Sequence, residues 1–392
     1  MNSDLKILHI SNWYPNKWNS LEAPFIKDQF EALSSYASCE LWHVQVRNEG
    51  SLFKIESGDY SNKEHYLILN TKIQNAFLVE RLHFLLLLML KRKLKNKQFD
   101  LVNFHIAYPL LRFVRSVKKI FGKKIVITEH WSAYRKGFNL SQGNRARKRI
   151  ENIFHHQIPV IAVSNALMHD IKNFAGTGDF SQFIVPNIVD TDLFYPAKSD
   201  KNSQRPIRFL MVASWAPIKR PFLVLEAFKK MAAENKNIQL FIIGAGYQWD
   251  AMFQFVKENN LEDHVFFLGR KKRKEIADEL RETTVFLHPS DYETFSVVCA
   301  EAQCCGIPVI ASNVGGIKEV LPPTAGILVE NNVPDWLNAM QSVVSEKGLK
   351  AFDSIEVARN AVKRFSRQKV AEAYYDCLEK CVEYQPALFA SK

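Results

Sequence analysis

The sequence predicts an α/β protein built from two doubly wound, parallel-sheet domains. Its 392 residues exceed the usual size of one domain and suggest two, each able to bury its own core. Short apolar, β-branched runs recur between helix-like segments, and such nearly continuous apolarity is typical of strands covered by helices on both faces. A polar stretch, residues 196–206, has the composition of a linker, and the same rhythm restarts after it.

Five strands are predicted in each half. Those of the first half cover residues 5–11, 39–46, 99–106, 123–130 and 158–164. Those of the second half cover residues 207–214, 238–244, 264–269, 284–290 and 307–312. We expect an N-terminal domain over 1–198, a C-terminal domain over 203–365 that faces it across a central cleft, and a terminal helix in 366–392, with Ser366 as N-cap, that packs back on the first domain.

The composition favours an ordered globular protein, with 47% hydrophobic and 24% charged residues. The net charge of +11 favours phosphate-bearing ligands, anionic membrane surfaces or nucleic acid. The six cysteines show neither a disulfide framework nor a four-ligand zinc spacing, so buried reduced thiols are expected. The start "MNSDLK" lacks the pattern of a secretory signal, and no apolar run approaches the ~18 residues of a membrane span, so a cytoplasmic protein is expected.

Ligands of doubly wound sheets bind beyond the carboxyl ends of the strands. This rule selects the polar or small residues that end the predicted strands. They are Ser11, His105, His130, Ser164, Ser214, Gly244 and Ser290.

Two glutamates, Glu293 and Glu301, fall in the apolar stretch "DYETFSVVCAEAQCCGIPVIAS". Gly306 and Pro308 predict the end of a helix that starts near Glu293. Eight helical residues separate the carboxylates by roughly 12 Å along the axis, more than the roughly 5–9.5 Å between the two carboxylates of a glycosidase. The spacing suits two hydroxyl-bearing groups at the ends of one extended ligand.

Between these ends, the amides of Thr294, Phe295 and Ser296 are expected at the helix N-terminus, where unpaired N–H groups and the helix dipole favour phosphate. The order hydroxyl, phosphate, hydroxyl predicts a nucleotide sugar. The alternative is a pair of solvent-facing helix glutamates with no role in binding.

The segment 289–321, "PSDYETFSVVCAEAQCCGIPVIASNVGGIKEVL", resembles the Glu-x7-Glu region of family 4 retaining glycosyltransferases, which have the GT-B fold of two Rossmann-like domains. Three further segments are similar to this family: "ILHISNWYP" (7–15), "VPNIVDTDLFYP" (185–196) and "FIIGAG" (241–246). The likeness covers nearly the whole chain and is weak over 50–95.

The resemblance implies catalytic roles for His130, Glu293 and Lys219. Glu293 is expected to face the hydroxyls of the donor sugar, and His130 to lie beside that sugar as a hydrogen-bonding and charge-stabilising group. Lys219 is the expected cationic partner of the diphosphate, whose negative charge grows as the glycosidic bond breaks. Glu129 is expected either to orient His130 or to face solvent.

The resemblance also implies a donor-binding set. Glu301 is expected to receive the ribose hydroxyls, with the amides after Glu293 on the diphosphate. One departure is that Ala213-Ser214 stands where the family usually has Gly-Arg, and Arg220 and Arg270 are the candidates to replace the missing arginine. The expected donor-binding residues are Glu301, Thr294, Phe295, Ser296, Ser214, Gly244 and Arg270; the acceptor-side candidates are His105, Asn12 and Trp13.

A basic, leucine-rich segment spans residues 77–98 and carries Lys91, Arg92, Lys93, Lys95 and Lys97. It fits a helix lying on an anionic membrane, or a buried helix that emerges into a solvated basic turn. A second basic cluster, residues 144–154, adds weight to the membrane interpretation.

The leading functional prediction is a retaining glycosyltransferase that uses a nucleotide sugar, with no cofactor and no bound metal. A glycan or undecaprenyl-type lipid-linked acceptor, in surface polysaccharide or lipopolysaccharide synthesis, follows from the family resemblance. A nucleotide-sugar epimerase of the same fold is an alternative. A basic nucleic-acid-binding protein is another, but no recognised module supports it.

Overall fold

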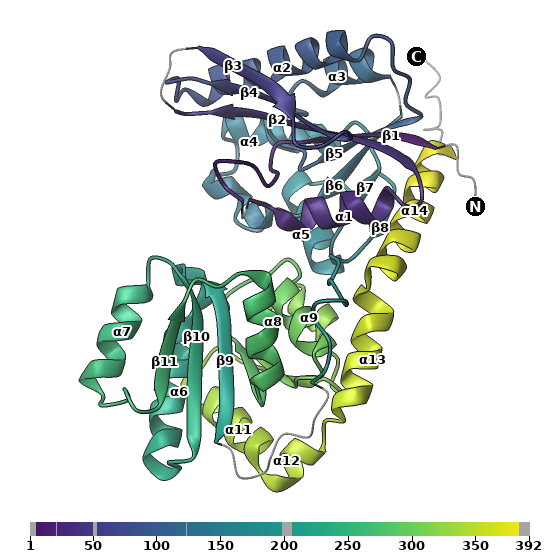
Figure 1. The fold of residues 1–392 in the computed structure, drawn as a ribbon. Coiled ribbons are helices and arrows are strands. Elements are labelled where there is room, and N and C mark those ends of the chain that lie inside the picture. The colour runs from purple at the N-terminus through teal and green to yellow at the C-terminus, as the bar shows by residue number, and fades with distance from the viewer. Residues whose placement is uncertain (1–4, 21, 50–52, 123, 198–205, 384–392) are drawn as a thin grey trace. The chain divides into compact units, whose positions relative to one another are not determined.

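The structure is a computed structural model that describes residues 5–20, 22–49, 53–122, 124–197 and 206–383 (Figure 1). The chain forms two compact units: unit 1 comprises Met1–Ile188 with Arg367–Lys392, and unit 2 comprises Val189–Ser366. The start of "MNSDLK" and most of the predicted linker lie outside the described residues.

The change of unit falls between Ile188 and Val189, ahead of the boundary expected near 198–203. The physical reason is a pair of contacts within unit 2 that ties its first residue to its last. The amide of Val189 donates to the carbonyl of Phe365 at 2.8 Å, and Val189 forms an isolated parallel bridge with Ser366. The polar composition of residues 196–206 indicates a loop, but the contacts of Val189 show that unit 2 begins before that loop.

Unit 1 is built on an eight-stranded sheet in the order β3-β4-β2-β1-β5-β6-β7-β8. All neighbouring pairs are parallel except β3 with β4. In this unit, strands β3, β4 and β8 were not predicted from the sequence. The strands are β1 (Lys6–Ser11), β2 (Ser38–Arg47), β3 (Lys54–Asp59), β4 (Glu64–Asn70), β5 (Leu101–His105), β6 (Ile125–Glu129), β7 (Val160–Ala162) and β8 (Gln182–Ile184).

Helices cover both faces of this sheet (Figure 1). The last helix, α14 (Arg367–Glu383), belongs to unit 1 and packs against α1 and β6. Its apolar residues, including Leu378, join Ile7 of β1 in one buried cluster. The other helices are α1 (Pro24–Leu33), α2 (Ala76–Lys93), α3 (Val114–Phe121), α4 (Arg145–Phe154) and α5 (Asn165–Ala175), with 3-10 turns η1 (Ser132–Tyr134) and η2 (Gly137–Asn139).

Unit 2 has a six-stranded parallel sheet in the order β11-β10-β9-β12-β13-β14. Its strands are β9 (Ile207–Ser214), β10 (Ile238–Ala245), β11 (Val265–Gly269), β12 (Val285–His288), β13 (Val309–Ser312) and β14 (Gly326–Val329). Its helices are η3 (Pro217–Lys219), α6 (Pro221–Glu234), α7 (Trp249–Glu258), α8 (Arg273–Glu282), α9 (Val297–Cys304), α10 (Ile317–Val320), α11 (Val333–Val344), α12 (Glu346–Lys350) and α13 (Ser354–Phe365). The prediction of two doubly wound α/β halves is confirmed.

The strand orders reverse between β1 and β5 in unit 1, and between β9 and β12 in unit 2. Such reversals open a crevice at the carboxyl ends of the strands, where ligands bind. All six cysteines lie among the described residues as free thiols, and five of them are buried. None of the helices in the described ranges combines the length and apolarity needed to cross a bilayer.

Candidate active site

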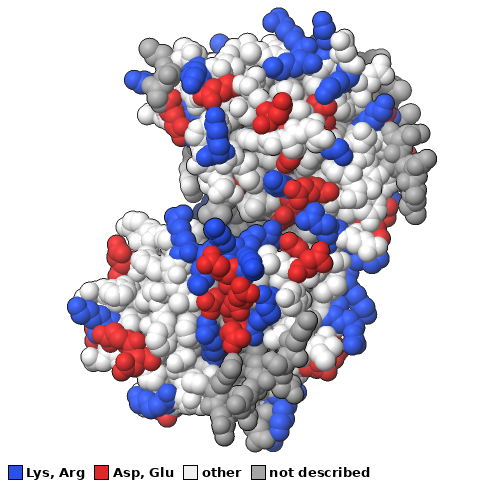
Figure 2. Space-filling view, in the orientation of Figure 1, with Lys and Arg blue, Asp and Glu red and all other residues white. Residues whose placement is uncertain are grey.

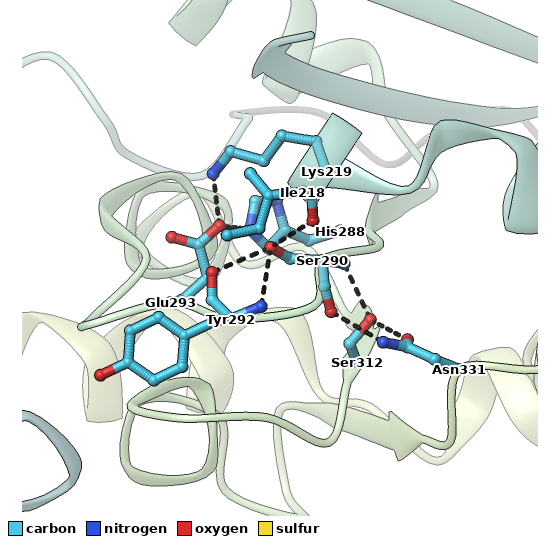
Figure 3. A network of polar contacts seen from close by, with 8 residues as sticks. All are labelled: Ile218, Lys219, His288, Ser290, Tyr292, Glu293, Ser312 and Asn331. Atoms are coloured by element: carbon cyan, nitrogen blue, oxygen red, sulfur yellow. Dashed lines mark hydrogen bonds and ion pairs between the residues drawn. The ribbon is translucent and has the colours of Figure 1, made fainter. Parts of the chain in front are cut away.

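The reversal point of unit 2 brings together Lys219, Glu293 and His288 (Figure 3). Lys219 ends the turn that follows β9, and His288 ends the neighbouring strand β12. The Lys219 ammonium donates to Oε1 of Glu293, and Nε2 of His288 lies 2.9 Å from the same oxygen. A lysine and a glutamate 74 residues apart therefore form one ion pair where ligand binding is expected.

The pKa of Glu293 is lowered to about 2. Burial by itself raises the pKa, but the Lys219 ammonium and the hydrogen bond from His288 outweigh it. The carboxylate is therefore ionised throughout the physiological pH range. It can accept hydrogen bonds from hydroxyl groups, and it cannot act as a general acid.

A closed ring of hydrogen bonds holds the loop that carries Glu293 (Figure 3). The Ser290 amide donates to Oγ of Ser312 at 2.9 Å, Ser312 donates to Oδ1 of Asn331 at 2.6 Å, and Asn331 returns to the Ser290 carbonyl at 2.9 Å. The amide of Asp291 donates to the carbonyl of Ile218 at 2.8 Å. This last bond joins the Glu293 loop to the turn of Lys219, so the two loops are positioned together.

Two glycines after β13 lie against the backbone of the Glu293 loop. The Gly316 amide donates to the Glu293 carbonyl at 2.8 Å. A Cβ on Gly315 would lie 2.2 Å from that carbonyl oxygen, and a Cβ on Gly316 would lie 2.1 Å from the carbonyl oxygen of Thr294. Only glycine permits this approach, so the "GG" of the sequence is a signal for the site that the sequence analysis left unused.

The predicted start of the glutamate-bearing helix is wrong. Helix α9 begins at Val297, because Ser296 adopts a left-handed backbone conformation (φ 75°) that the helix cannot continue through. Phe295 instead turns into the interior, with its ring 5.5 Å from that of Phe365. Glu293 therefore lies in a loop, and the predicted axial separation of roughly 12 Å from Glu301, which requires a continuous helix, does not apply.

The same finding moves the amides expected to face a phosphate. The first-turn amides of α9 are those of Val297, Val298 and Cys299, not those of Thr294, Phe295 and Ser296. The Ser296 hydroxyl is buried beside the thiol of Cys299. The helix N-terminus remains at the reversal point, with its first-turn amides three residues later than predicted.

Glu301 is held inside α9 and is only 6% exposed. Its Oε1 lies 3.5 Å from the guanidinium of Arg273, the first residue of α8. The expected arginine, Arg270, is instead exposed just beyond the edge strand β11. Arg220 pairs with Asp291 at 3.6 Å on the surface. Sequence reasoning missed Arg273 because the run "RKKRKE" offers several cations of equal appearance.

Ser214 is exposed at the end of β9, and Gly244 lies beside it near the end of β10. Gly244 has φ 126°, and a Cβ there would lie 1.9 Å from the Ala213 carbonyl oxygen. The buried Trp215 donates from Nε1 to the Ile243 carbonyl at 3.1 Å. The glycine therefore lets the two strand ends pack closely, and its contacts in the structure are with β9.

In unit 1, three histidine rings stack at the reversal point. His9 and His105 lie 5.2 Å apart and His105 and His130 lie 6.1 Å apart by ring centroids. Nδ1 of His9 and Nε2 of His105 are hydrogen-bonded at 3.0 Å, and Phe25 covers His130 at 4.6 Å. The register that places Ser11 opposite His105 explains why these strand ends meet.

These rings are neutral. Burial lowers the pKa of His105 to about 3, and burial together with the field of His105 lowers the pKa of both His9 and His130. His130 can therefore offer a neutral ring nitrogen to a ligand. Its expected role beside the donor sugar stays a prediction, and the neutral ring would fill it, because desolvation disfavours the imidazolium.

Glu129 is fully buried and supports the loop after β6. Its carboxylate accepts from the amides of Ala107 at 2.7 Å and His130 at 3.1 Å, and from the hydroxyl of Tyr134. Burial raises its pKa against these hydrogen bonds. Of the two expectations for Glu129, the solvent-facing one is wrong, and the carboxylate fixes the backbone of His130.

The acceptor-side candidates differ in access. His105 is 0% exposed and lies too deep for direct contact with a ligand. Asn12 is nearly buried and pairs through Oδ1 with Nε2 of His83 at 3.0 Å. Trp13 is half-buried and meets Trp131 edge-on at 5.0 Å. Of these three candidates Trp13 is the most exposed, and Trp131 beside it is half-buried as well.

Tyr374 of α14 is a buried residue that the sequence analysis missed. Asn103 donates from Nδ2 to the Tyr374 hydroxyl at 2.6 Å, and Thr128 lies 2.8 Å from the same oxygen. Nδ2 of Asn103 also lies 3.3 Å from Nδ1 of His9. The terminal helix is thereby connected to the histidine stack, a contact across 271 residues that no local pattern announces.

Comparisons with known proteins agree with this geometry. Residues 194–361 match the family described as glycosyl transferases group 1, and residues 56–193 match glycosyltransferase family 4. The chain belongs to these glycosyltransferases. The predicted family is therefore confirmed.

Curated relatives include N-acetyl-alpha-D-glucosaminyl L-malate synthase from Bacillus anthracis, 28% identical over 58% of this chain and 60% of that one. Another is a component of the phosphatidylinositol N-acetylglucosaminyltransferase of Arabidopsis thaliana, 26% identical over 74% of this chain and 64% of that one. The matches span about three fifths of the length of these relatives.

Solved structures share the fold at low identity. Sucrose-phosphate synthase from Thermosynechococcus elongatus has a TM-score of 0.76 at 19% identity, covering 96% of this chain and 98% of that one. HepE of Anabaena in complex with UDP has a TM-score of 0.74 at 16% identity, covering 96% and 100%. These likenesses support the GT-B fold predicted from the sequence.

Proposed function

We propose that the protein is a retaining, metal-independent glycosyltransferase that transfers a sugar from a nucleotide-diphosphate donor to a glycan or lipid-linked acceptor. The observation that carries the proposal is the Lys219–Glu293 ion pair at the strand reversal of unit 2, with His288 on the same carboxylate and helix α9 starting just beyond it. This is a cation, a fixed carboxylate and a set of helix amides in one place.

The donor nucleotide fits the charges of this site. The first-turn amides of α9 and the Lys219 ammonium would face the diphosphate, where the helix dipole favours negative charge. As the glycosidic bond breaks, charge grows on the diphosphate, and a fixed cation stabilises that change most. Glu301, held beside Arg273, would accept the ribose hydroxyls. Anabaena HepE, which shares the fold, has been solved with UDP and with UDP-glucose bound, and this supports a nucleotide-sugar donor.

The donor sugar would meet neutral and anionic groups. Glu293, ionised by its partners, would accept hydrogen bonds from the sugar hydroxyls. His130 would offer a neutral ring nitrogen, oriented through the backbone hydrogen bond that Glu129 accepts. These two roles come from family membership together with the ionisation states described above.

The acceptor would be a glycan or an undecaprenyl-type lipid-linked sugar used in surface polysaccharide synthesis, with the protein peripheral on the inner face of the membrane. Two comparisons support it. One structural relative is a lipopolysaccharide outer core galactosyltransferase, 19% identical with a TM-score of 0.72. The curated Arabidopsis relative is named for phosphatidylinositol.

A donor screen tests the proposal. UDP-, GDP- and ADP-sugars are added to the full chain and thermal unfolding is followed; a donor at roughly 100 times its Kd should add about 2.7 kcal/mol to the stability. The Glu301→Gln variant should lose much of that response, and Glu262→Gln, an exposed glutamate of unit 2, should keep it. A flat response to every donor would contradict the proposal.

Product analysis with the active donor separates transfer from its alternative. A transferase releases the nucleoside diphosphate only when acceptor is present, whereas an epimerase changes the sugar and leaves it attached. Turnover should persist in EDTA, because Lys219 and the α9 amides can neutralise the diphosphate. Loss of turnover in EDTA, restored by manganese or magnesium, would show that this neutralisation is insufficient.

A further inference from the structure

One helix of unit 1 carries a solvent-facing apolar stripe. Phe77, Leu78, Leu85 and Leu88 of α2 are 39%, 43%, 45% and 38% exposed. At about 100° per residue, these four side chains, with Arg81 and Arg92, fall within one arc of about 100°. We call these six residues the α2 face.

The opposite side of α2 is already occupied. Its buried residues are Glu80, His83, Leu86, Leu87 and Leu90, and the helix packs on β2 and β4. Glu80, the single acidic residue of α2, is 1% exposed and is neutralised by Arg112 at 3.1 Å and Arg149 at 3.3 Å. The α2 face therefore combines large apolar side chains with arginines and has no carboxylate of its own.

Further cations extend this face at the end of the helix. Lys91, Lys93 and Lys95 are exposed, and Lys93 donates to the Ser57 hydroxyl at 3.3 Å. Among the residues that the structure describes, Arg81, Lys91, Arg92 and Lys95 form no ion pair with a carboxylate. Figure 2 shows Lys and Arg gathered over the part of unit 1 where α2 and α3 lie in Figure 1.

A hollow of about 270 Å³ lies beside the end of α2. Its lining includes Leu94, Phe99 and Phe121, with Lys91 and Lys97. The Lys97 ammonium is paired with Glu40 at 2.6 Å. The apolar walls and the Lys91 ammonium match an anionic lipid, whose upper acyl chain and phosphate need these two kinds of contact. The hollow therefore continues the chemistry of the α2 face.

We infer that the α2 face docks on an anionic lipid bilayer, lying in the plane of the interface with the leucines in the acyl boundary and the cations at the headgroups. This orientation suits a helix whose outer face mixes leucine with arginine and lysine. A nucleic acid would be attracted by the cations but would gain nothing from the four exposed apolar side chains. The inference rests on the proposed function, since it places the enzyme at a membrane that could hold a lipid-linked acceptor.

Vesicle flotation with the full chain tests the inference. Phosphatidylcholine vesicles that contain phosphatidylglycerol should bind the protein, and pure phosphatidylcholine vesicles should bind it far less. The variant with Lys91→Gln, Arg92→Gln and Lys95→Gln should bind roughly 100-fold more weakly, because each basic residue near an anionic surface contributes about fivefold. The variant with Leu85→Ser and Leu88→Ser should lose about tenfold, and salt should weaken the wild type.

Matched variants in unit 2 provide the controls. Lys229→Gln, Lys230→Gln and Lys257→Gln remove the same charge from exposed positions, and Phe253→Ser with Ile355→Ser removes side chains that are 57% and 65% exposed. Both controls should float like the wild type. Equal losses in controls and α2 variants would overturn the inference, as would an absence of vesicle binding. Tighter binding to double-stranded DNA than to vesicles, lost with the same three α2 cations, would assign the face to nucleic acid.

Donor-induced thermal stabilisation is measured on the same variants. The α2 variants should respond to the donor like the wild type, because none of the changed residues lies in unit 2. A normal donor response without vesicle binding overturns only the membrane inference. Vesicle binding without any donor response would support docking of the α2 face on the bilayer and contradict the proposed function.

Discussion

The two strand reversals of this protein carry opposite kinds of polar chemistry. In unit 2 the groups are charged and paired, as in Lys219 with Glu293 and Arg273 with Glu301. In unit 1 they are neutral and buried, with the pKa values of His9, His105 and His130 all lowered. The same sheet architecture thus presents ions in one unit and neutral hydrogen-bonding groups in the other.

This difference follows from solvent access. An ion pair persists at partial exposure, and the side chains of Lys219 and Glu293 are 22% and 14% exposed. A lone imidazolium in a site with no exposure would cost too much desolvation energy, so the histidine stack stays neutral.

The largest expected effect comes from breaking the ion pair. We expect Lys219→Met to lower kcat roughly 100- to 1,000-fold, because a fixed charge opposite the developing diphosphate charge is lost. Activity measured with a soluble acceptor and a saturating donor would check this. Lys230→Met, an exposed lysine of α6, should leave kcat unchanged, and an equal loss there would point to a general effect of charge.

The same variant should also become sensitive to acid. In the wild type the Glu293 pKa is lowered from 4.5 to about 2, so the carboxylate stays ionised, and the stability it contributes is lost only as the pH falls through that interval. Without the Lys219 ammonium, which lowers the pKa of Glu293, the effect of burial is less compensated and that pKa rises. The residual activity of Lys219→Met should then fall with decreasing pH where the wild type is still flat. Parallel pH–rate profiles would contradict the proposed electrostatic coupling.

Substitution of the two glutamates should change different quantities, kcat for Glu293 and donor affinity for Glu301. Glu293→Gln should mainly lower kcat, because the sugar contact strengthens as charge redistributes, and Glu301→Gln should mainly weaken donor binding, because ribose is unchanged during transfer. Each loses a hydrogen bond to a charged group, about 1.5–3 kcal/mol, or roughly ten- to 150-fold. Steady-state kinetics together with calorimetric donor binding would separate them. Small, equal changes in kcat and donor affinity in both folded variants would show that neither glutamate contacts the donor.

Beside the neutral histidine stack of unit 1, substitution of Tyr374 is expected to reduce stability. Tyr374→Phe leaves Asn103 and Thr128 buried without their shared hydroxyl and should reduce the free energy of unfolding by about 1–3 kcal/mol. Urea unfolding would measure it. Tyr375→Phe removes a partly exposed hydroxyl that meets Glu379 at 3.3 Å and should change stability little. If the two variants were equally stable, α14 would not be anchored through Tyr374.

The smallest expected effect is on donor binding and is measured by substituting Arg273, with Arg270 as the comparison. Arg273→Gln should weaken donor binding by up to about fivefold, since the guanidinium pairs with Glu301 at 3.5 Å and is partly exposed, where ion pairs contribute about 0–1 kcal/mol. Arg270→Gln should have no effect on donor binding. Calorimetric titration of both variants would show it. A larger loss of donor affinity in Arg270→Gln would support Arg270, the arginine predicted from the sequence, as the donor-binding residue.

Much of the site was predictable because its signals are local. The strand ends at His130, Ser214 and Gly244 follow from runs of apolar residues, and the spacing of Glu293 and Glu301 follows from the chain itself. The error in the helix start was also local in origin. A composition rich in Val, Ala and Cys favours helix, and nothing in it shows that Ser296 takes a left-handed conformation while Phe295 turns into the interior.

The sequence by itself determined the two α/β halves, the family, and the strand-end positions where polar residues gather, because hydrophobic periodicity and motif spacing are properties of neighbouring residues. Tertiary structure decided which distant side chains meet. It paired Lys219 with Glu293, placed Arg273 beside Glu301 and joined Tyr374 to Asn103. It also decided the charge of each group, since a pKa depends on burial and on partners brought together by folding.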